Sequence, residues 1–192
     1  MSTGSPLLLL FAADPDSTKS IVHALIASRL DYCNSVLYRI NTNATKNLQS
    51  VLHSAARLIM RKRKFDSITP TIRDDLHWLP VPQRIDYKLC LIIYRCLHQT
   101  APVYLQDLCV PVSTTASSRH LRSAARGDLQ VLATKIVTFR PHSFASSAPK
   151  LWNSLPLPLR DSTLTLRQQF DSRLKTHLFS LAYGRASWLL RL

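Results

Sequence analysis

The sequence contains no glutamate and only 3 glycines among its 192 residues, so its 11 acidic side chains are all aspartates. Phosphate-cradling loops and dinucleotide fingerprints need two or three glycines within a short stretch, because bare backbone N–H groups must approach the phosphate. Gly4, Gly127 and Gly184 are far apart in the chain, which excludes both motifs. The common zinc protease and zinc deaminase signatures place a Glu beside the metal ligands, so their standard forms are absent as well.

Cysteine is also scarce and is not arranged in pairs. Cys33, Cys90, Cys96 and Cys109 form no C-x-x-C pair and have no His-x-x-x-His partner, which argues against a zinc site. Each lies in or beside an apolar helical pattern, where a thiol packs as a small hydrophobic group. This usage of cysteine is typical of a reducing compartment.

Long hydrophobic runs are missing too. The longest one, residues 6–13, is far shorter than the roughly 20 residues that a membrane span requires. It also lacks the basic segment that opens a secretory signal. We therefore expect no membrane association and an intracellular location, in the nucleus or the cytoplasm.

What the sequence has in excess is positive charge. It carries 25 Lys and Arg residues, a formal net charge of +14 at pH 7 and a pI near 10.2. Such a surplus predicts a polyanionic partner, because dense phosphate favours Lys and Arg through counterion release. A basic surface without a dedicated partner is the alternative, and net charge by itself leaves both open.

Apolar residues recur mostly at three- and four-residue steps, which predicts a mainly α protein, an irregular helical bundle. The strongest pattern covers residues 83–98. A small β-hairpin near residues 129–139 is the expected exception, formed by the β-prone runs 129–133 and 135–139. The expected helices are residues 16–40, 44–64, 71–78, 83–98, 102–108, 143–152 and 165–184.

The densest basic cluster lies at the expected end of the second of these helices and consists of Arg57, Arg61, Lys62, Arg63 and Lys64. Cations at such a place can contact a phosphate backbone without reading sequence. They can also simply be a solvated helix end that interacts with the helix dipole. Both interpretations stay open, although four consecutive cations exceed what capping needs.

A second basic segment, Arg119, His120, Arg122 and Arg126, lies in a Ser-, Thr- and Ala-rich stretch that reads as a surface loop. An Arg-rich flexible segment can become ordered on RNA or DNA. It can equally remain a solvated loop.

No constellation in the sequence supports catalysis. Asp74 and Asp75 are adjacent, as in the metal pair of polymerases, but their context reads as a helical turn rather than a turn between strands. There is no G-x-S-x-G motif, and Cys96 and His98 face different sides of an expected helix. We therefore assign no catalytic, cofactor-binding or metal-binding residue and expect no cofactor.

Several short strings occur in a fixed order along residues 17–183. They are SRLDYCNS (28–35), AARL (55–58), DSITP (66–70), LHWLPV (76–81), RIDYK (84–88), APVYL (101–105), LRS (121–123), APKLWNSLP (148–156) and LKTHLF (174–179). Together these strings closely resemble the C-terminal region of the polymerase protein of LINE-type (non-LTR) retrotransposons.

The resemblance implies a helical appendage that follows the reverse-transcriptase palm, on its thumb side and beyond. Its implied partners are RNA, DNA or an RNA–DNA hybrid, bound without sequence preference, and the rest of a retrotransposon polymerase. The palm aspartates, the fingers and the endonuclease have no counterpart here. We therefore expect a truncated polymerase product that is catalytically inactive alone. The alternative is a helical protein-interaction module or a transposon remnant without function.

The resemblance also suggests a division of the chain into five parts. Residues 1–16 are expected to be an extension outside the family and residues 17–110 a helical, thumb-like region. Residues 111–128 form a basic polar linker. A small hairpin and C-terminal helices occupy residues 129–184, and residues 185–192 are a tail.

Overall fold

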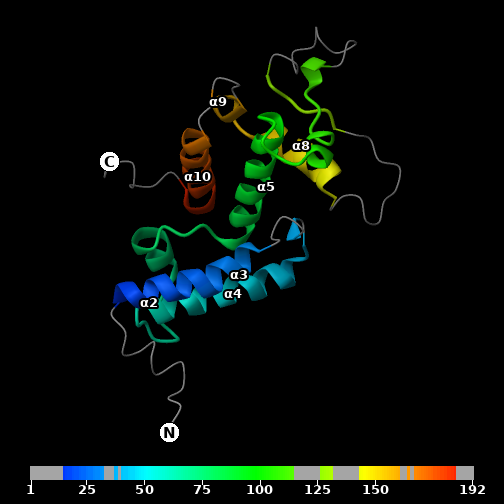
Figure 1. The fold of residues 1–192 in the computed structure, drawn as a ribbon. Helices are drawn as coiled ribbons and strands as arrows, with labels where there is room; N and C mark the ends of the chain where they lie inside the picture. The colour runs from blue at the N-terminus through cyan, green and yellow to red at the C-terminus, as the bar shows by residue number, and fades with distance from the viewer. Residues whose placement is uncertain are drawn as a thin grey trace. The chain divides into compact units, whose positions relative to one another are not determined.

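The computed structural model describes most of the chain and divides it into two compact units, each of which is considered by itself. The described residues are 15–32, 37–38, 40–114, 126–131, 143–160, 164 and 167–184. The first unit contains the described residues up to Tyr32 and the segment Asn41–Val81. The second contains residues from Pro82 onward, together with a short stretch that ends at Ile40. Both are helical, which confirms the mainly α prediction (Figure 1).

The first unit is built on two helical segments that pack side by side (Figure 1). The earlier segment comprises α2 (Pro15–Val22), the π-helical turn η1 (His23–Ala27) and α3 (Ser28–Asp31). The later one is α4 (Thr42–Ile59), whose first turn is capped where the Asn41 side chain accepts the Ala44 N–H at 2.8 Å. The short turn η3 (Thr71–Asp75) completes the unit.

Three expected helix ends in this unit are wrong, and one of them is that of the second helix, which was expected to reach residue 64 but ends at Ile59. The first helix was expected to reach residue 40, but it ends at Asp31, and Tyr38 already lies in a turn. Asn41 caps α4 with a non-helical backbone, at a ψ of 153°. The first helix and α4 are therefore separate helices and not one continuous helix. The third helix ends at Asp75 rather than at residue 78, because His77 takes a left-handed φ of 49°.

The core of the first unit forms where α4 meets the chain that follows it. Buried side chains on the helix are Leu52, Ala55, Ala56 and Ile59. Those on the later chain are Ile68, Ile72, Leu76, Trp78, Leu79 and Val81. Val51, next to Leu52 on the helix, lies outside this buried face and is 47% exposed.

A row of polar side chains on α4 is half-buried. Gln49, His53 and Arg57 follow one another at four-residue steps. The Gln49 Oε1 accepts the Val81 N–H at 2.8 Å, and its Nε2 lies 2.8 Å from the His53 Nε2. These polar groups face inward because they satisfy backbone groups of the chain that returns to the helix.

The second unit is organised around α5 (Val81–Leu97), which confirms the strongest helix prediction. Pro82 lies in its first turn, where a missing N–H is tolerated, so the helix begins two residues earlier than expected. The other elements of the unit are α6 (Val103–Gln106), η4 (Val112–Thr114), α8 (Phe144–Ser154), α9 (Leu157–Arg160) and α10 (Arg167–Tyr183).

Aromatic contacts join the three longest helices of this unit. The ring of Phe170 on α10 stacks on Tyr94 of α5 with centroids 4.4 Å apart and lies 5.9 Å from Trp152 of α8. The buried Tyr94 hydroxyl donates to the Leu164 carbonyl at 2.8 Å, which ties the segment before α10 to α5. Leu174 and Leu178 continue the buried face of α10.

The expected β-hairpin lies largely outside the described residues, because the structure does not describe residues 132–140. Leu129, at its start, instead forms an isolated antiparallel bridge with Pro111. The Val112 N–H donates to the Asp128 carbonyl at 2.9 Å, and the Gln130 N–H donates to the Val110 carbonyl at 2.8 Å. The two described ends of the expected basic linker are therefore paired with each other.

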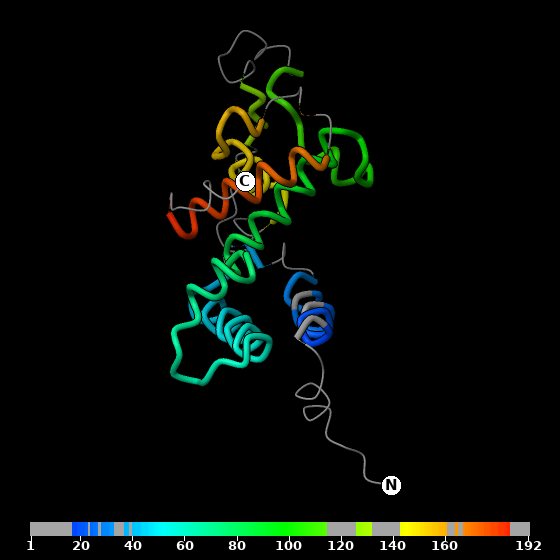
Figure 2. Tube along the Cα trace, turned by 90° about the vertical axis from the view of Figure 1, so that its left-hand side faces the viewer, coloured from blue at the N-terminus to red at the C-terminus, as the bar shows by residue number. Residues whose placement is uncertain are grey.

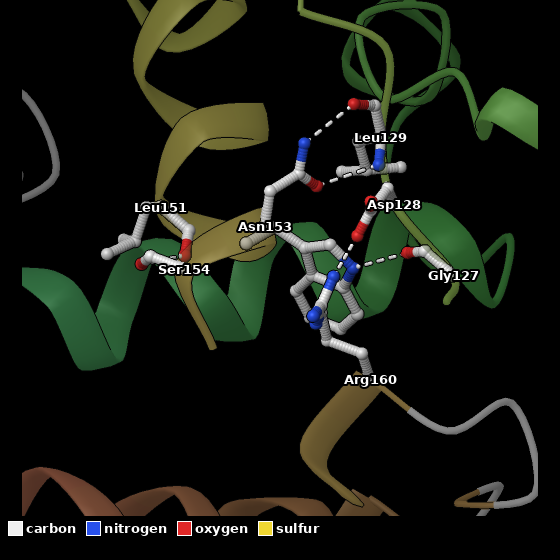
Figure 3. Close-up of polar contacts among 8 residues, drawn as sticks. Gly127, Asp128, Leu129, Leu151, Asn153, Ser154 and Arg160 are labelled. Carbon is white, nitrogen blue, oxygen red and sulfur yellow. Dashed lines mark hydrogen bonds and ion pairs between the residues drawn. The ribbon is translucent and has the colours of Figure 1, made fainter. Parts of the chain in front are cut away.

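The LWNSLP string holds the later of these two ends in place (Figure 3). The Asn153 side chain accepts the Leu129 N–H at 2.8 Å and donates to the Leu129 carbonyl at 2.9 Å. The Trp152 Nε1 donates to the Gly127 carbonyl at 3.1 Å, and Arg160 forms an ion pair with Asp128. Side chains of α8 and α9 thus satisfy the edge of this segment that is not paired with residues 110–112.

The position of Gly127 in this segment accepts only glycine without strain. Its φ of 67° is left-handed, and a Cβ there would lie 2.9 Å from the Arg160 carbonyl oxygen. Gly184, at the end of α10, shares the left-handed φ but has open space around it.

Replacing Asn153 by Ala should lower the free energy of unfolding by about 2 kcal/mol, because both backbone groups of Leu129 lose their side-chain partner. Urea unfolding measures the change. The neighbouring Ser154→Ala is the matched control, since that exposed hydroxyl bonds only locally to the Leu151 carbonyl. A loss of similar size in both variants would contradict the role given to Asn153.

A second stability prediction concerns Asp86 on α5, where burial raises the carboxyl pKa to about 6. The unfolded chain ionises this group near pH 4, so the folded state is progressively penalised between about pH 4 and 6. Asp86→Asn should therefore become more stable than the unmodified protein as pH rises through this window, and equally stable below it. Urea unfolding at several pH values tests this, with the exposed Asp107→Asn as control.

Candidate nucleic-acid interface

Four cations of the basic cluster, Arg61 to Lys64, follow α4 in a loop, and only Arg57 lies in the helix itself, which corrects the expected helix over residues 44–64. The helix ends at Ile59 with Met60 as its cap. Arg61 then takes a left-handed φ of 50°. The Arg61 N–H donates to the Leu58 carbonyl at 3.4 Å, and the Lys62 N–H donates to the Arg57 carbonyl at 3.0 Å. This is a Schellman-type helix end with arginine where glycine is usual.

A tight turn, Arg63–Asp66, comes directly after this helix end, and we call it the basic turn. The Asp66 N–H donates to the Arg63 carbonyl at 3.2 Å, which closes the turn. The Asp66 carboxylate accepts the Arg63 N–H in return, at 2.7 Å. Two reciprocal hydrogen bonds between its first and last residues therefore hold the backbone of the basic turn.

Arg57 differs from the other cations of the cluster because it is half-buried on α4. Its Nη2 donates to the Asp66 carbonyl at 3.4 Å, so it braces the basic turn from the helix side. One turn earlier on the helix, burial and the neighbouring Arg57 charge lower the pKa of His53. A neutral His53 also agrees with its contact to the Gln49 amide nitrogen, which has hydrogens to donate.

The remaining four cations, Arg61, Lys62, Arg63 and Lys64, are exposed. In Figure 2 the chain after α4 forms a loop beside the helix, and these residues open it. The structure thus gathers four of the predicted contact residues on one short surface segment, with Arg57 beneath them.

The second predicted basic segment is described only in part. Arg119 and Arg122 lie outside the described residues. Arg126 is exposed and directly precedes Gly127, the first residue of the segment that α8 and α9 hold. It belongs to the second unit, whereas the basic turn belongs to the first.

Acidic, His and Cys side chains, the usual protein ligands of metal ions, also occur among the described residues outside the basic cluster. The Asp74 carboxylate is bound by the guanidinium of Arg73, with nitrogen–oxygen distances of 2.7 and 2.8 Å. Within the described ranges, no group of three His, Cys or Asp side chains is placed to hold a metal ion. No helix in the described part of the chain is long and apolar enough to cross a bilayer.

The first unit also contains an open groove of about 380 Å³ between η1 and α4. Its apolar lining is Ile26, Val51, Ala55 and Leu58. Leu25, on η1, is itself 62% exposed. This part of the surface is apolar, in contrast to the basic turn.

Sequence reasoning missed two residues of the site. The first is Phe65, which is 92% exposed at the tip of the basic turn. The second is Asp66, whose carboxylate accepts the Arg63 N–H and so holds the backbone of the turn. The role of Asp66 could have been predicted from the sequence, because Asp side chains often accept nearby backbone N–H groups in turns. The exposure of Phe65 had no signal, since an isolated aromatic residue is as typical of a core.

Comparisons of the chain with family models, with curated proteins and with solved structures give no match.

The left-handed Arg61 yields a stability prediction. Arg61→Gly should raise the free energy of unfolding by about 0.5 to 1 kcal/mol, because glycine adopts this φ without steric cost. Urea unfolding compares it with Arg63→Gly, which removes the same charge at a residue without a positive φ. That control should be destabilised or unchanged. Equal effects of the two substitutions would contradict the prediction.

Proposed function

We propose that the chain is a helical, nucleic-acid-binding region of an RNA-directed DNA polymerase of the LINE-type retrotransposon family. In this proposal it binds RNA, DNA or their hybrid without sequence preference and contributes no catalytic residue. The observation that carries the binding proposal is the set of four consecutive exposed cations, Arg61 to Lys64, on a loop with a fixed backbone.

The geometry of the loop supports contact with phosphate. Phosphate contacts depend on positive charge and on position rather than on base identity. Asp66 is the acidic residue of the segment, and its carboxylate is engaged with the Arg63 N–H. Because Arg57 and Asp66 hold the backbone, a ligand has to order only the cation side chains, which lowers the entropic cost of binding.

The family part of the proposal is supported by where the resembling strings lie in the fold. Trp152 and Asn153 of LWNSLP hold the segment Gly127–Leu129. Trp78 and Leu79 of LHWLPV are buried in the first unit. Strings that occupy such demanding positions are expected of a shared fold rather than of chance matches.

Binding should depend strongly on salt. With a labelled RNA–DNA primer–template, the logarithm of affinity should fall linearly with the logarithm of salt concentration. Each phosphate contact contributes about 0.7 to 0.9 to the slope. Replacing Arg61, Lys62, Arg63 and Lys64 together by Ala should flatten the slope by up to about 3.5 and weaken binding at low salt. Fluorescence anisotropy across a salt series measures both.

The matched control removes the same charge elsewhere. Lys88, Lys150, Arg173 and Lys175 are exposed cations of the second unit, and their combined replacement by Ala leaves the basic turn intact. This control should retain most of the salt slope. If both variants lose the same amount of salt slope, binding depends on net charge alone and not on the basic turn. Binding without any salt dependence would overturn the proposal.

The apolar groove between η1 and α4 favours a second candidate, a helical protein-interaction module. Val51 lines this groove and is 47% exposed, and Leu25, which precedes the lining residue Ile26 in the chain, is 62% exposed. Apolar surface gathered in this way is typical of protein contact sites. This candidate gains support if the protein self-associates, if Leu25→Lys restores a monomer in sedimentation, and if hybrid binding is absent.

A further inference from the structure

Phe65 is the most exposed large apolar side chain among the described residues, at 92%. It directly follows the four cations and is the third residue of the basic turn Arg63–Asp66. The hydrogen bonds between Arg63 and Asp66 span Lys64 and Phe65, so both side chains leave a closed backbone at its tip. The ring is therefore held outward by the turn and not by packing against a neighbour.

We propose that the Phe65 ring is a stacking platform for an unpaired base, which makes single-stranded RNA or DNA the ligand class of the basic turn. This inference rests on the proposed function, because it assumes that the neighbouring cations contact phosphate. It adds a contact with the base, which the cations alone do not supply.

The arrangement of ring and charge matches the two parts of a nucleotide. The Lys64 Nζ lies 5.8 Å from the centroid of the Phe65 ring. A base stacked on the ring places its own phosphate near Lys64 and the cations that precede it. Every base has a π-face, so such stacking tolerates any sequence.

The ring selects for single strands because a base inside a duplex has both faces covered by its neighbours. An unpaired base, in a single strand or at the open end of a hybrid, has a free face. Phosphate contacts, in contrast, are available on duplexes and single strands alike. The basic turn is thus expected to bind both forms and to prefer the one with an exposed base.

An anionic membrane surface also attracts cations and an aromatic ring. Binding to such a surface scales with the apolar area that enters it, and is typical of an amphipathic helix with a wide apolar face. The basic turn offers one ring among charged neighbours, which is too small an apolar area for that purpose. One ring is sufficient for a stacked base, so the observations favour nucleic acid.

The test compares Phe65→Ala with the unmodified full chain on two probes, a labelled oligouridylate and a blunt duplex hairpin of equal length. Fluorescence anisotropy across a salt series gives affinity and slope. We expect Phe65→Ala to lose about ten-fold in affinity for the single strand. Its duplex affinity and its salt slope should be unchanged, because the phosphate contacts remain. Folding should be unaffected, since the ring is almost fully exposed.

Two further variants identify the interaction as stacking. Phe65→Trp keeps an aromatic face and should restore or improve single-strand binding. Phe65→Leu keeps apolar bulk without a π-face and should resemble Phe65→Ala. Equal binding by the Leu and Phe forms would overturn the proposal.

The outcomes also separate this inference from the proposed function. If binding is salt-dependent and is lost when Arg61 to Lys64 become Ala, but Phe65→Ala binds both probes like the unmodified chain, the inference fails and the proposed function stands. If neither probe binds with a salt-dependent affinity, the proposed function fails first. If Phe65→Ala loses affinity for phosphatidylserine vesicles and not for the oligouridylate, the ring belongs to a membrane contact and the inference is overturned.

Discussion

Both units depend on the same constraint, which is that backbone polar groups on an edge without a partner strand must still be satisfied. Side-chain amides provide these partners. In the second unit Asn153 holds both the N–H and the carbonyl of Leu129, and in the first unit Gln49 accepts the Val81 N–H. A single amide side chain has both a donor and an acceptor, so it can take over the role of one residue in a neighbouring strand. This explains how long irregular connections remain ordered in a protein without a sheet in its described part.

The scarcity of glycine also affects the backbone conformation. Left-handed backbone conformations occur at Arg61, His77 and Gln99, where side chains normally disfavour them. At Arg61 and at Gln99 the conformation ends a long helix, and backbone N–H groups after the helix bond back to its last carbonyls. The strain is thus accepted where the hydrogen bonds of a helix end compensate for it. The same strain at Arg61 places the basic turn outside the helix, where its cations are exposed.

The helices could be predicted from the sequence wherever apolar residues recur strongly, as along α5, where Ile85, Leu89 and Ile93 follow one another at four-residue steps and are all buried. The end of α4 could not be predicted, because the usual signal for a helix end is glycine and Arg61 stands in its place, whereas the ends of α5 and α10 were predicted to within one residue. The inward-facing Gln49 was missed because its partner, the Val81 N–H, lies 32 residues away, and periodicity carries no information about such contacts. The cations of the candidate site were visible in the sequence, but the brace from Arg57 to Asp66 depends on the fold.

The half-buried row Gln49, His53 and Arg57 has a consequence for motion in the first unit. One end of the row bonds to the Val81 N–H and the other to the Asp66 carbonyl. Local unfolding of α4 from Gln49 to its C-terminal end would therefore release Val81 and the base of the loop in one event. Segments that open together behave as a single cooperative unit in hydrogen exchange. The loop and the residues near Val81 thus share one local opening equilibrium, although they are separated by more than a dozen residues of chain.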